Sequence, residues 1–168
     1  PGSAFGTGSH PTTRLCLEAL EQAPPLEALV ADLGCGSGIL GLGALGLGAM
    51  GVVAADTDSL AVRATGDNRE LNGRSGDQLK VSLGSVEALQ ELLEGRRADL
   101  LLCNILAPVI EALAPGFDSL VAPEGRALLS GLLVDQAPRL EQVLGDLGWR
   151  VTARGSQGRW GLLEIRRR

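Results

Sequence analysis

The sequence predicts an α/β domain built on a mostly parallel sheet with helices on both faces. Short apolar runs alternate with helix-like stretches along the chain, as expected for repeated strand–helix units. The connections are short, and a glycine-rich turn at residues 34–38 joins the first strand-like run to a long apolar stretch. With 168 residues, the chain suits one domain with a full hydrophobic core.

The first predicted element is a helix. Residues 1–10 are rich in Gly and Ser and are expected to form a loop, whereas Pro11 suits the first turn of a helix. Leucines at roughly helical spacing continue this helix from Thr12 to Gln22, and Pro24-Pro25 ends it. Strands are then predicted near residues 28–33, 52–56, 79–83, 98–103, 126–131, 149–154 and 160–166. Helices are predicted between them, near residues 38–48, 58–72, 86–94, 108–121 and 135–147.

The last two predicted strands are connected differently from the others. Only the short segment 155–158 separates them, which cannot hold the crossover that parallel neighbours need. We therefore expect an antiparallel hairpin at the C-terminal edge of a seven-stranded sheet.

One stretch is long and apolar enough to resemble a membrane span. Residues 38–55 carry no charge, which meets the length criterion for a spanning helix. Six of these positions are Gly, and Asp32 and Asp56 flank the stretch. A helix followed by a buried strand explains this pattern better, so no membrane association is expected.

Composition narrows the classes of partner. The net charge of −5 argues against strong sequence-independent binding to nucleic acid, which needs a basic face. Cys16, Cys35 and Cys103 are far apart and odd in number, so neither a zinc site nor a disulfide framework is expected. We expect a monomer in a reducing cytoplasm. Because the chain starts at Pro1 in a loop, we also expect a segment upstream.

The glycine turn is the main candidate for a binding site. The run Asp32–Gly38 reads Asp-Leu-Gly-Cys-Gly-Ser-Gly, and its glycines allow a sharp turn and a close approach to a ligand. Asp56 closes the next strand-like run. A glycine turn followed about twenty residues later by an acid is typical of sites for adenosine-containing ligands.

Two ligands compete for this turn. Residues 36–41 fit the G-x-G-x-x-G pattern of nicotinamide dinucleotide sites, but a diphosphate gains nothing from the Asp32 carboxylate. S-adenosylmethionine carries a sulfonium and an ammonium group, which that carboxylate attracts. Asp56 would then accept hydrogen bonds from the ribose hydroxyls, and Asp58 is expected to cap the following helix. A tight turn without a ligand is the third interpretation.

Three motifs together resemble a known family. The glycine turn with Asp56 resembles the class I S-adenosylmethionine-dependent methyltransferases. Residues Phe5–Thr13 resemble the F-G-T-G-x-H-x-T-T segment of the PrmA family, and Asn104–Ala107 resemble its N-I-L-A motif. The resemblance covers nearly the whole chain and implies a Rossmann-like three-layer sandwich. It also implies methylation of lysine and N-terminal amines of ribosomal protein L11.

The resemblance also implies roles for individual residues. It makes S-adenosyl-L-methionine the cofactor, with Thr13 bonding it from the first helix, Gly34 contacting it through the backbone and Asp56 holding its ribose. Asn104 is the implied catalytic residue, between cofactor and acceptor nitrogen. The implied neighbours of the cofactor are Phe5, Thr7 and Gly36. Because the family carries an N-terminal recognition domain, residues 1–168 are predicted to be the catalytic domain without it.

Several alternatives remain open for these residues. Asn104 can instead cap the helix near Pro108, and His10 is expected to order the loop rather than to transfer protons. No aromatic side chain follows Asn104, which favours an aliphatic amine over a nucleobase as acceptor. The alternative functions are a cofactor-binding domain that is inactive alone, a methyltransferase for another protein or small amine, and a nicotinamide-dependent oxidoreductase.

Overall fold

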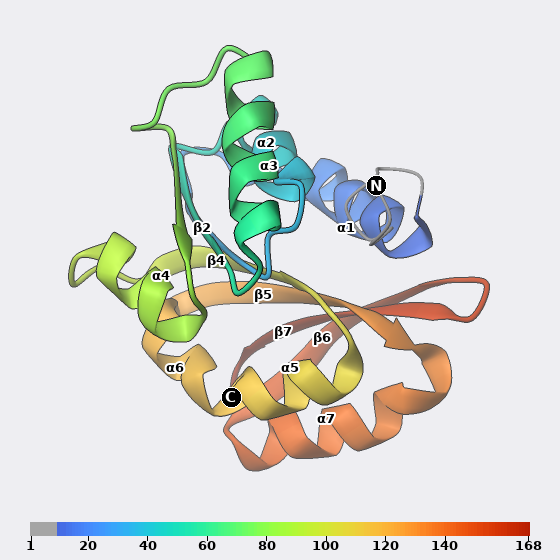
Figure 1. The fold of residues 1–168 in the computed structure, drawn as a ribbon. Helices are drawn as coiled ribbons and strands as arrows, with labels where there is room; N and C mark the ends of the chain where they lie inside the picture. The colour runs from blue at the N-terminus through green and yellow to red at the C-terminus, as the bar shows by residue number, and fades with distance from the viewer. Residues whose placement is uncertain (1–9) are drawn as a thin grey trace.

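The computed structural model describes residues 10–168, which form a sheet between two layers of helices (Figure 1). The strands are β1 Leu29–Leu33, β2 Gly51–Asp56, β3 Leu79–Leu83, β4 Ala98–Asn104, β5 Val121–Leu133, β6 Trp149–Gln157 and β7 Trp160–Arg167. The helices are α1 Pro11–Gln22, α2 Ile39–Gly46, α3 Ser59–Leu71, α4 Val86–Leu93, α5 Ala107–Leu113, α6 Phe117–Leu120 and α7 Ala137–Asp146, with 3-10 turns η1 Ala114–Gly116 and η2 Val134–Gln136. The predicted fold class and the seven strands are confirmed.

The strand order is β3-β2-β1-β4-β5-β7-β6. All neighbours from β3 to β5 run parallel, whereas β7 runs antiparallel to both β5 and β6. Within residues 10–168, β7 is therefore the one reversed strand, as the short final connection predicts. The hairpin is tighter than predicted, because β6 continues through residues 155–157 and Gln157 pairs with Trp160.

Two predicted boundaries were wrong. The helix expected at 108–121 is divided into α5, η1 and α6, because Pro115 has no N–H to continue the helical hydrogen bonds. Strand β5 begins at Val121 rather than near residue 126. Its register against β4 shifts between Ala98 and Leu100, so that residues 122–125 are accommodated as an irregularity within the strand.

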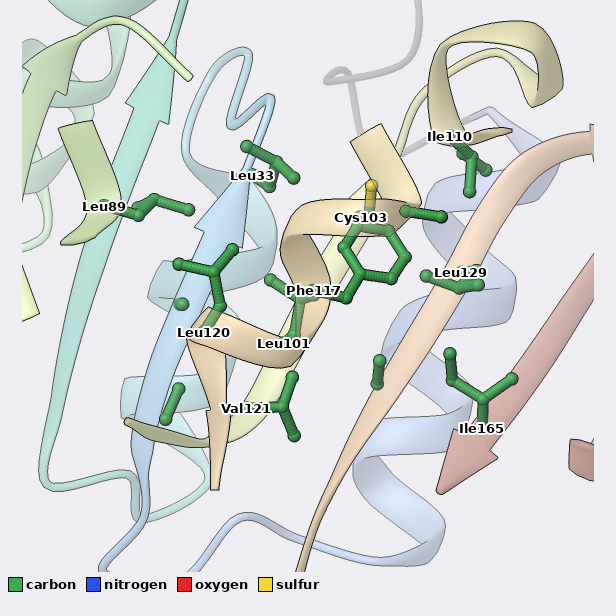
Figure 2. Packing of buried hydrophobic residues seen from close by; sticks show 14 of the residues in the cluster. Leu33, Leu89, Leu101, Cys103, Ile110, Phe117, Leu120, Val121, Leu129 and Ile165 are labelled. Carbon is green, nitrogen blue, oxygen red and sulfur yellow. The ribbon is translucent and has the colours of Figure 1, made fainter. Parts of the chain in front are cut away.

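The uncharged stretch at residues 38–55 folds as α2 followed by β2, as predicted. Among the described residues, no helix is both long and apolar enough to cross a membrane. Buried aliphatic side chains fill both sides of the sheet, and Figure 2 shows Phe117 packed among Leu101, Cys103 and Leu129. This side of the core is thus built mainly from aliphatic residues, with Phe117 and Trp149 among them.

The sheet places the polar strand ends at a common edge. Asp32 lies near the carboxyl end of β1, and Asp56 and Asn104 end β2 and β4, the two neighbours of β1. Strands β2 and β3 lie on one side of β1, whereas β4 and β5 lie on the other side, so the strand order reverses between β1 and β4. In open α/β sheets, ligands bind outside the carboxyl ends of strands at such a reversal point.

Candidate active site

The glycine turn is hydrogen-bonded to the carboxyl end of β2. The backbone amides of Gly34 and Cys35 both donate to the Ala55 carbonyl, at 2.8 and 3.0 Å. Gly34, Gly36 and Gly38 have φ values of +78°, +56° and +84°, a region that other residues enter only with strain. The turn therefore requires glycine at these three positions for conformational reasons.

Neighbouring side chains add a steric reason at two of them. A Cβ atom at Gly34 would lie 2.6 Å from Cγ2 of Ile105, and one at Gly38 would lie 2.9 Å from Cγ2 of Thr65. At Gly36 nothing lies within 4 Å of the equivalent position. The turn is thus packed tightly at its two ends and is open at its middle glycine.

The carboxylate of Asp56 is held in one orientation by the backbone. Its Oδ2 accepts from the Gly36 amide at 3.0 Å, and its Oδ1 accepts from the Asp58 amide at 2.9 Å. A carboxylate has about four acceptor positions, so both oxygens can still accept from a ligand. The Asp58 side chain accepts from the Leu60 amide as the N-cap of α3, which confirms its predicted capping role.

A small cavity with both polar and apolar lining lies at the glycine turn. It measures about 30 Å³ and is lined by Asp32, Gly34, Cys35, Gly36, Ile39, Leu40 and Asn104. Oδ2 of Asp32 and Oδ1 of Asn104 are buried and have no hydrogen-bond partner among the described residues. Buried oxygen acceptors without donors are costly, so this cavity is suited to a ligand that brings hydrogen-bond donors or positive charge.

The Asp32 side chain is under electrostatic strain. Asp32 is only 2% exposed, and burial raises the pKa of its carboxyl group to about 7. The negative charge of Asp56 adds to this increase, while a hydrogen bond from the Gly41 backbone opposes it. A cation next to Asp32 would relieve both causes of the strain, whereas an anion would add to them.

The structure brings four of the predicted site residues together. Gly34, Gly36 and Asn104 line the small cavity, and Asp56 is bonded directly to Gly36. Thr13 is fully buried on α1 but is not among the described residues that line the cavity. The predictions for Phe5 and Thr7 lie outside the described residues.

The helix-cap alternative for Asn104 is wrong. The N-cap of α5 is Leu106, and no side chain caps this helix. Asn104 instead is the last residue of β4, and the residue is only 7% exposed. Its amide oxygen is buried and has no hydrogen-bond partner among the described residues.

His10 caps the first helix, and the cysteines are buried. Nδ1 of His10 accepts from the Thr12 amide at 3.2 Å and so caps α1, and its ring packs edge-on against Trp160 at 4.9 Å. Burial lowers the pKa of His10, with a smaller contribution from the charge of Arg14. Cys35 and Cys103 are buried, and burial strongly raises the pKa of both thiols. Neither is a reactive thiolate.

Sequence reasoning missed two residues on α3 that contact the turn. Oγ1 of Thr65 donates to the Gly36 carbonyl at 2.9 Å, and Nδ2 of Asn68 donates to the Ser37 carbonyl at 2.8 Å. The available signal was their spacing of three residues, which places both on one face of a helix that follows Asp56. Sequence reasoning also missed a larger cavity of about 760 Å³ between α5 and α7, lined in part by Ala107, Glu111 and Asp135.

The strand order and the site at the carboxyl edge define the class I S-adenosylmethionine-dependent methyltransferase fold. The magnesium protoporphyrin IX methyltransferase of Synechocystis PCC 6803, solved with bound cofactor, shares this fold with a TM-score of 0.72 at 21% identity, over 94% of this chain and 78% of that one.

The family model for ribosomal protein L11 methyltransferase (PrmA) matches residues 1–168, and the chain belongs to this family. It is 91% identical over its whole length to the ribosomal protein L11 methyltransferase of Parasynechococcus marenigrum (strain WH8102), of which it spans 58%. The crystal structure of ribosomal protein L11 methylase from Lactobacillus delbrueckii subsp. bulgaricus superposes with a TM-score of 0.83 at 33% identity, over 94% of this chain and 79% of that one.

Proposed function

We propose that this chain is the catalytic domain of an S-adenosylmethionine-dependent protein N-methyltransferase that modifies lysine and N-terminal amines of ribosomal protein L11. The observation that carries the proposal is that Asp32 and Asn104, each with a buried acceptor oxygen that has no hydrogen-bond partner among the described residues, both line one small cavity at the glycine turn. When bound there, S-adenosylmethionine supplies an electrophilic methyl group on a positively charged sulfonium.

The residues present fit this cofactor better than a dinucleotide. Asp32 favours a cationic ligand, because a nearby positive charge stabilises its ionised form. A diphosphate would place more negative charge beside Asp32 and Asp56, which already repel each other. Asp56 is oriented by Gly36 and Asp58 and retains acceptor positions for two ribose hydroxyls.

The acceptor side of the site fits an aliphatic amine. Oδ1 of Asn104 can accept a hydrogen of the amine and so aim the nitrogen lone pair at the methyl group. Ile105 packs against the core and Leu106 is 53% exposed, so the residues after Asn104 offer no aromatic surface for a base to stack on. A lysine amine has an unperturbed pKa of about 10.4, and burial beside a cation favours its neutral, nucleophilic form.

The identity of the protein substrate is supported by family membership. Relatives at 91% and 66% identity are named for ribosomal protein L11, and this chain spans 58% and 56% of their lengths. The cofactor site lies within the shared part. Recognition of the ribosomal protein is proposed for the complete protein, acting as a monomer in the cytoplasm without direct contact to nucleic acid.

Calorimetry and mass spectrometry test this proposal. We expect the chain to bind S-adenosylmethionine and not NAD, and the complete protein to add methyl groups to purified ribosomal protein L11. Substitution Asn104→Ala should slow transfer by about tenfold to a hundredfold with a much smaller change in cofactor affinity, because one hydrogen bond to the reacting amine is lost. Asn72→Ala, at the exposed asparagine that follows the last residue of α3, is the matched control and should leave transfer unchanged.

Two results would contradict the proposal. Binding of NAD without S-adenosylmethionine would reassign the site to a dinucleotide. Equal losses of transfer and of cofactor affinity in Asn104→Ala would remove the aligning role of this residue. Methylation by the complete protein but not by residues 1–168 would favour the alternative in which this domain binds the cofactor but is inactive alone.

A further inference from the structure

Helix α3 holds two consecutive carbonyl groups of the glycine turn. Thr65 is fully buried, and its hydroxyl donates to the Gly36 carbonyl at 2.9 Å. One helical turn further on, the Asn68 amide donates to the Ser37 carbonyl at 2.8 Å. Two side chains on one face of a helix therefore hold the backbone of the turn at Gly36 and Ser37.

The hydrogen-bond directions at Thr65 follow from proton counting. A hydroxyl has one proton, and Thr65 gives it to the Gly36 carbonyl. The Cys35 sulfur, 3.3 Å from the same hydroxyl oxygen, must then be the donor, which requires a protonated thiol. Burial raises the pKa of Cys35 and keeps it protonated. Thr65 is thus fully satisfied by the turn, and each group in this chain of bonds has one defined role.

Gly36 is also hydrogen-bonded to Asp56, the residue proposed to bind the ribose. The Gly36 amide donates to Oδ2 of Asp56 at 3.0 Å, while its carbonyl accepts from Thr65. Gly36 has no Cβ and sits at φ +56°, so its own conformational preference does not restrict it to this geometry. The hydrogen bonds to Asp56 and Thr65 supply that restriction, the first at the Gly36 amide and the second at its carbonyl.

We propose that Thr65 and Asn68 are positioning residues for cofactor binding, which hold the glycine turn and, through the Gly36 amide, the Asp56 carboxylate in the binding geometry before the cofactor arrives. This proposal rests on the assignment of the turn to S-adenosylmethionine. Preorganisation lowers the conformational cost of binding, so losing these contacts should weaken affinity without slowing the chemical step.

The test uses matched variants of each residue. Thr65→Val keeps the shape of the side chain but has no hydroxyl, whereas Thr65→Ser keeps the hydroxyl. Asn68→Leu removes the amide. Asn72→Leu is its control, because the side-chain amide of Asn72, the C-cap residue of α3, donates to the Asn68 carbonyl at 2.7 Å rather than to the glycine turn. Affinities for S-adenosylmethionine and S-adenosylhomocysteine are measured by calorimetry, and exchange of the Gly36 amide is measured by NMR in the cofactor-free protein.

We expect Thr65→Val and Asn68→Leu to raise Kd for both ligands about tenfold and to speed Gly36 amide exchange at least tenfold. Thr65→Ser and Asn72→Leu should stay within twofold of the parent in both measurements. The kcat at saturating cofactor should change less than twofold in every variant. If Thr65→Val does not fold, Asn68→Leu at the half-buried Asn68, compared with Asn72→Leu, tests the same proposal.

Unchanged affinity and exchange in both Thr65→Val and Asn68→Leu would overturn the positioning role, as would a Thr65→Ser variant as impaired as Thr65→Val. These outcomes are distinct from failure of the proposed function. A parent protein that binds the cofactor but does not methylate ribosomal protein L11 would leave the affinity comparison intact. A parent that binds neither ligand would contradict both proposals.

Discussion

Replacing Asp32 by Asn should stabilise the cofactor-free protein at neutral and alkaline pH while weakening cofactor binding. Asp32 is buried, and its Oδ2 has no hydrogen-bond partner among the described residues. Burial and the charge of Asp56 raise the pKa of its carboxyl group from 3.8 to about 7. The ionised carboxylate is therefore a source of instability that asparagine, which is neutral and similar in shape, removes.

The sign and size of the effect follow from proton linkage. A carboxyl group whose pKa is raised on folding binds its proton more tightly in the folded state, so the stability it contributes below pH 4 is lost as the pH rises to about 7. Each unit of pKa difference corresponds to about 1.4 kcal/mol, and about three units give about 4 kcal/mol at pH 8. At pH 5 less than half of this loss has occurred, so the stabilisation by Asp32→Asn should be larger at pH 8 by about 2–3 kcal/mol.

Urea unfolding at pH 5 and pH 8, followed by the fluorescence of the buried Trp149, measures this difference. The same variant is titrated with S-adenosylmethionine at pH 8, where the loss of the carboxylate should weaken binding. A difference in the free energy of unfolding between parent and variant that is the same at pH 5 and pH 8 would refute the reasoning, because the pH dependence of that difference reports the raised pKa of Asp32. Stabilisation at pH 8 without loss of affinity would show that the carboxylate does not face the cofactor.

One further substitution tests the site, and a matched pair of glycine substitutions tests the backbone packing of the fold. Asp56→Ala should raise the calorimetric Kd for S-adenosylmethionine at least tenfold, because it removes charge-assisted bonds to the ribose and the partner of the Gly36 amide; an unchanged Kd would place the ribose elsewhere. Gly131→Ala should lower the free energy of unfolding by more than about 2 kcal/mol, since its φ is +89° and the new Cβ would lie 2.3 Å from the Ile105 carbonyl oxygen. Gly158→Ala, with φ +59° and nothing nearby, should cost about 1 kcal/mol; equal losses at both glycines would exclude the steric argument.

The accuracy of the sequence predictions depended on whether the signal was local. The glycine turn and the apolar runs around it were located correctly, because turn residues and strand patterns act over a few positions. The division of the helix at Pro115 and the early start of β5 were missed. Residues 122–125 lie between a predicted helix and a predicted strand, and only the pairing of the flanking Val121 and Arg126 with β4 includes them in β5.

The same distinction applies to the site. Asp32, Gly34 and Asp56 stand in a recognisable local pattern, so their proximity to one another follows from parallel strands that share an edge. Thr65 and Asn68 carry no such pattern, since polar residues on a helix face are ordinarily solvated. Their bonds to the turn depend on how α3 packs beside α2, which is a long-range contact.

The amino-acid sequence by itself determined the order of strands and helices, the reversed final strand and the position of the glycine turn, because each depends on chain lengths, glycine conformations and apolar periodicity. The tertiary structure alone decided that Asp32 and Asn104, each with a buried and unpartnered oxygen, line one small cavity, and that α3 holds the glycine turn beside it. These features arise from packing between segments distant in sequence, where burial and unpaired polar atoms are properties of the assembled fold rather than of any local stretch.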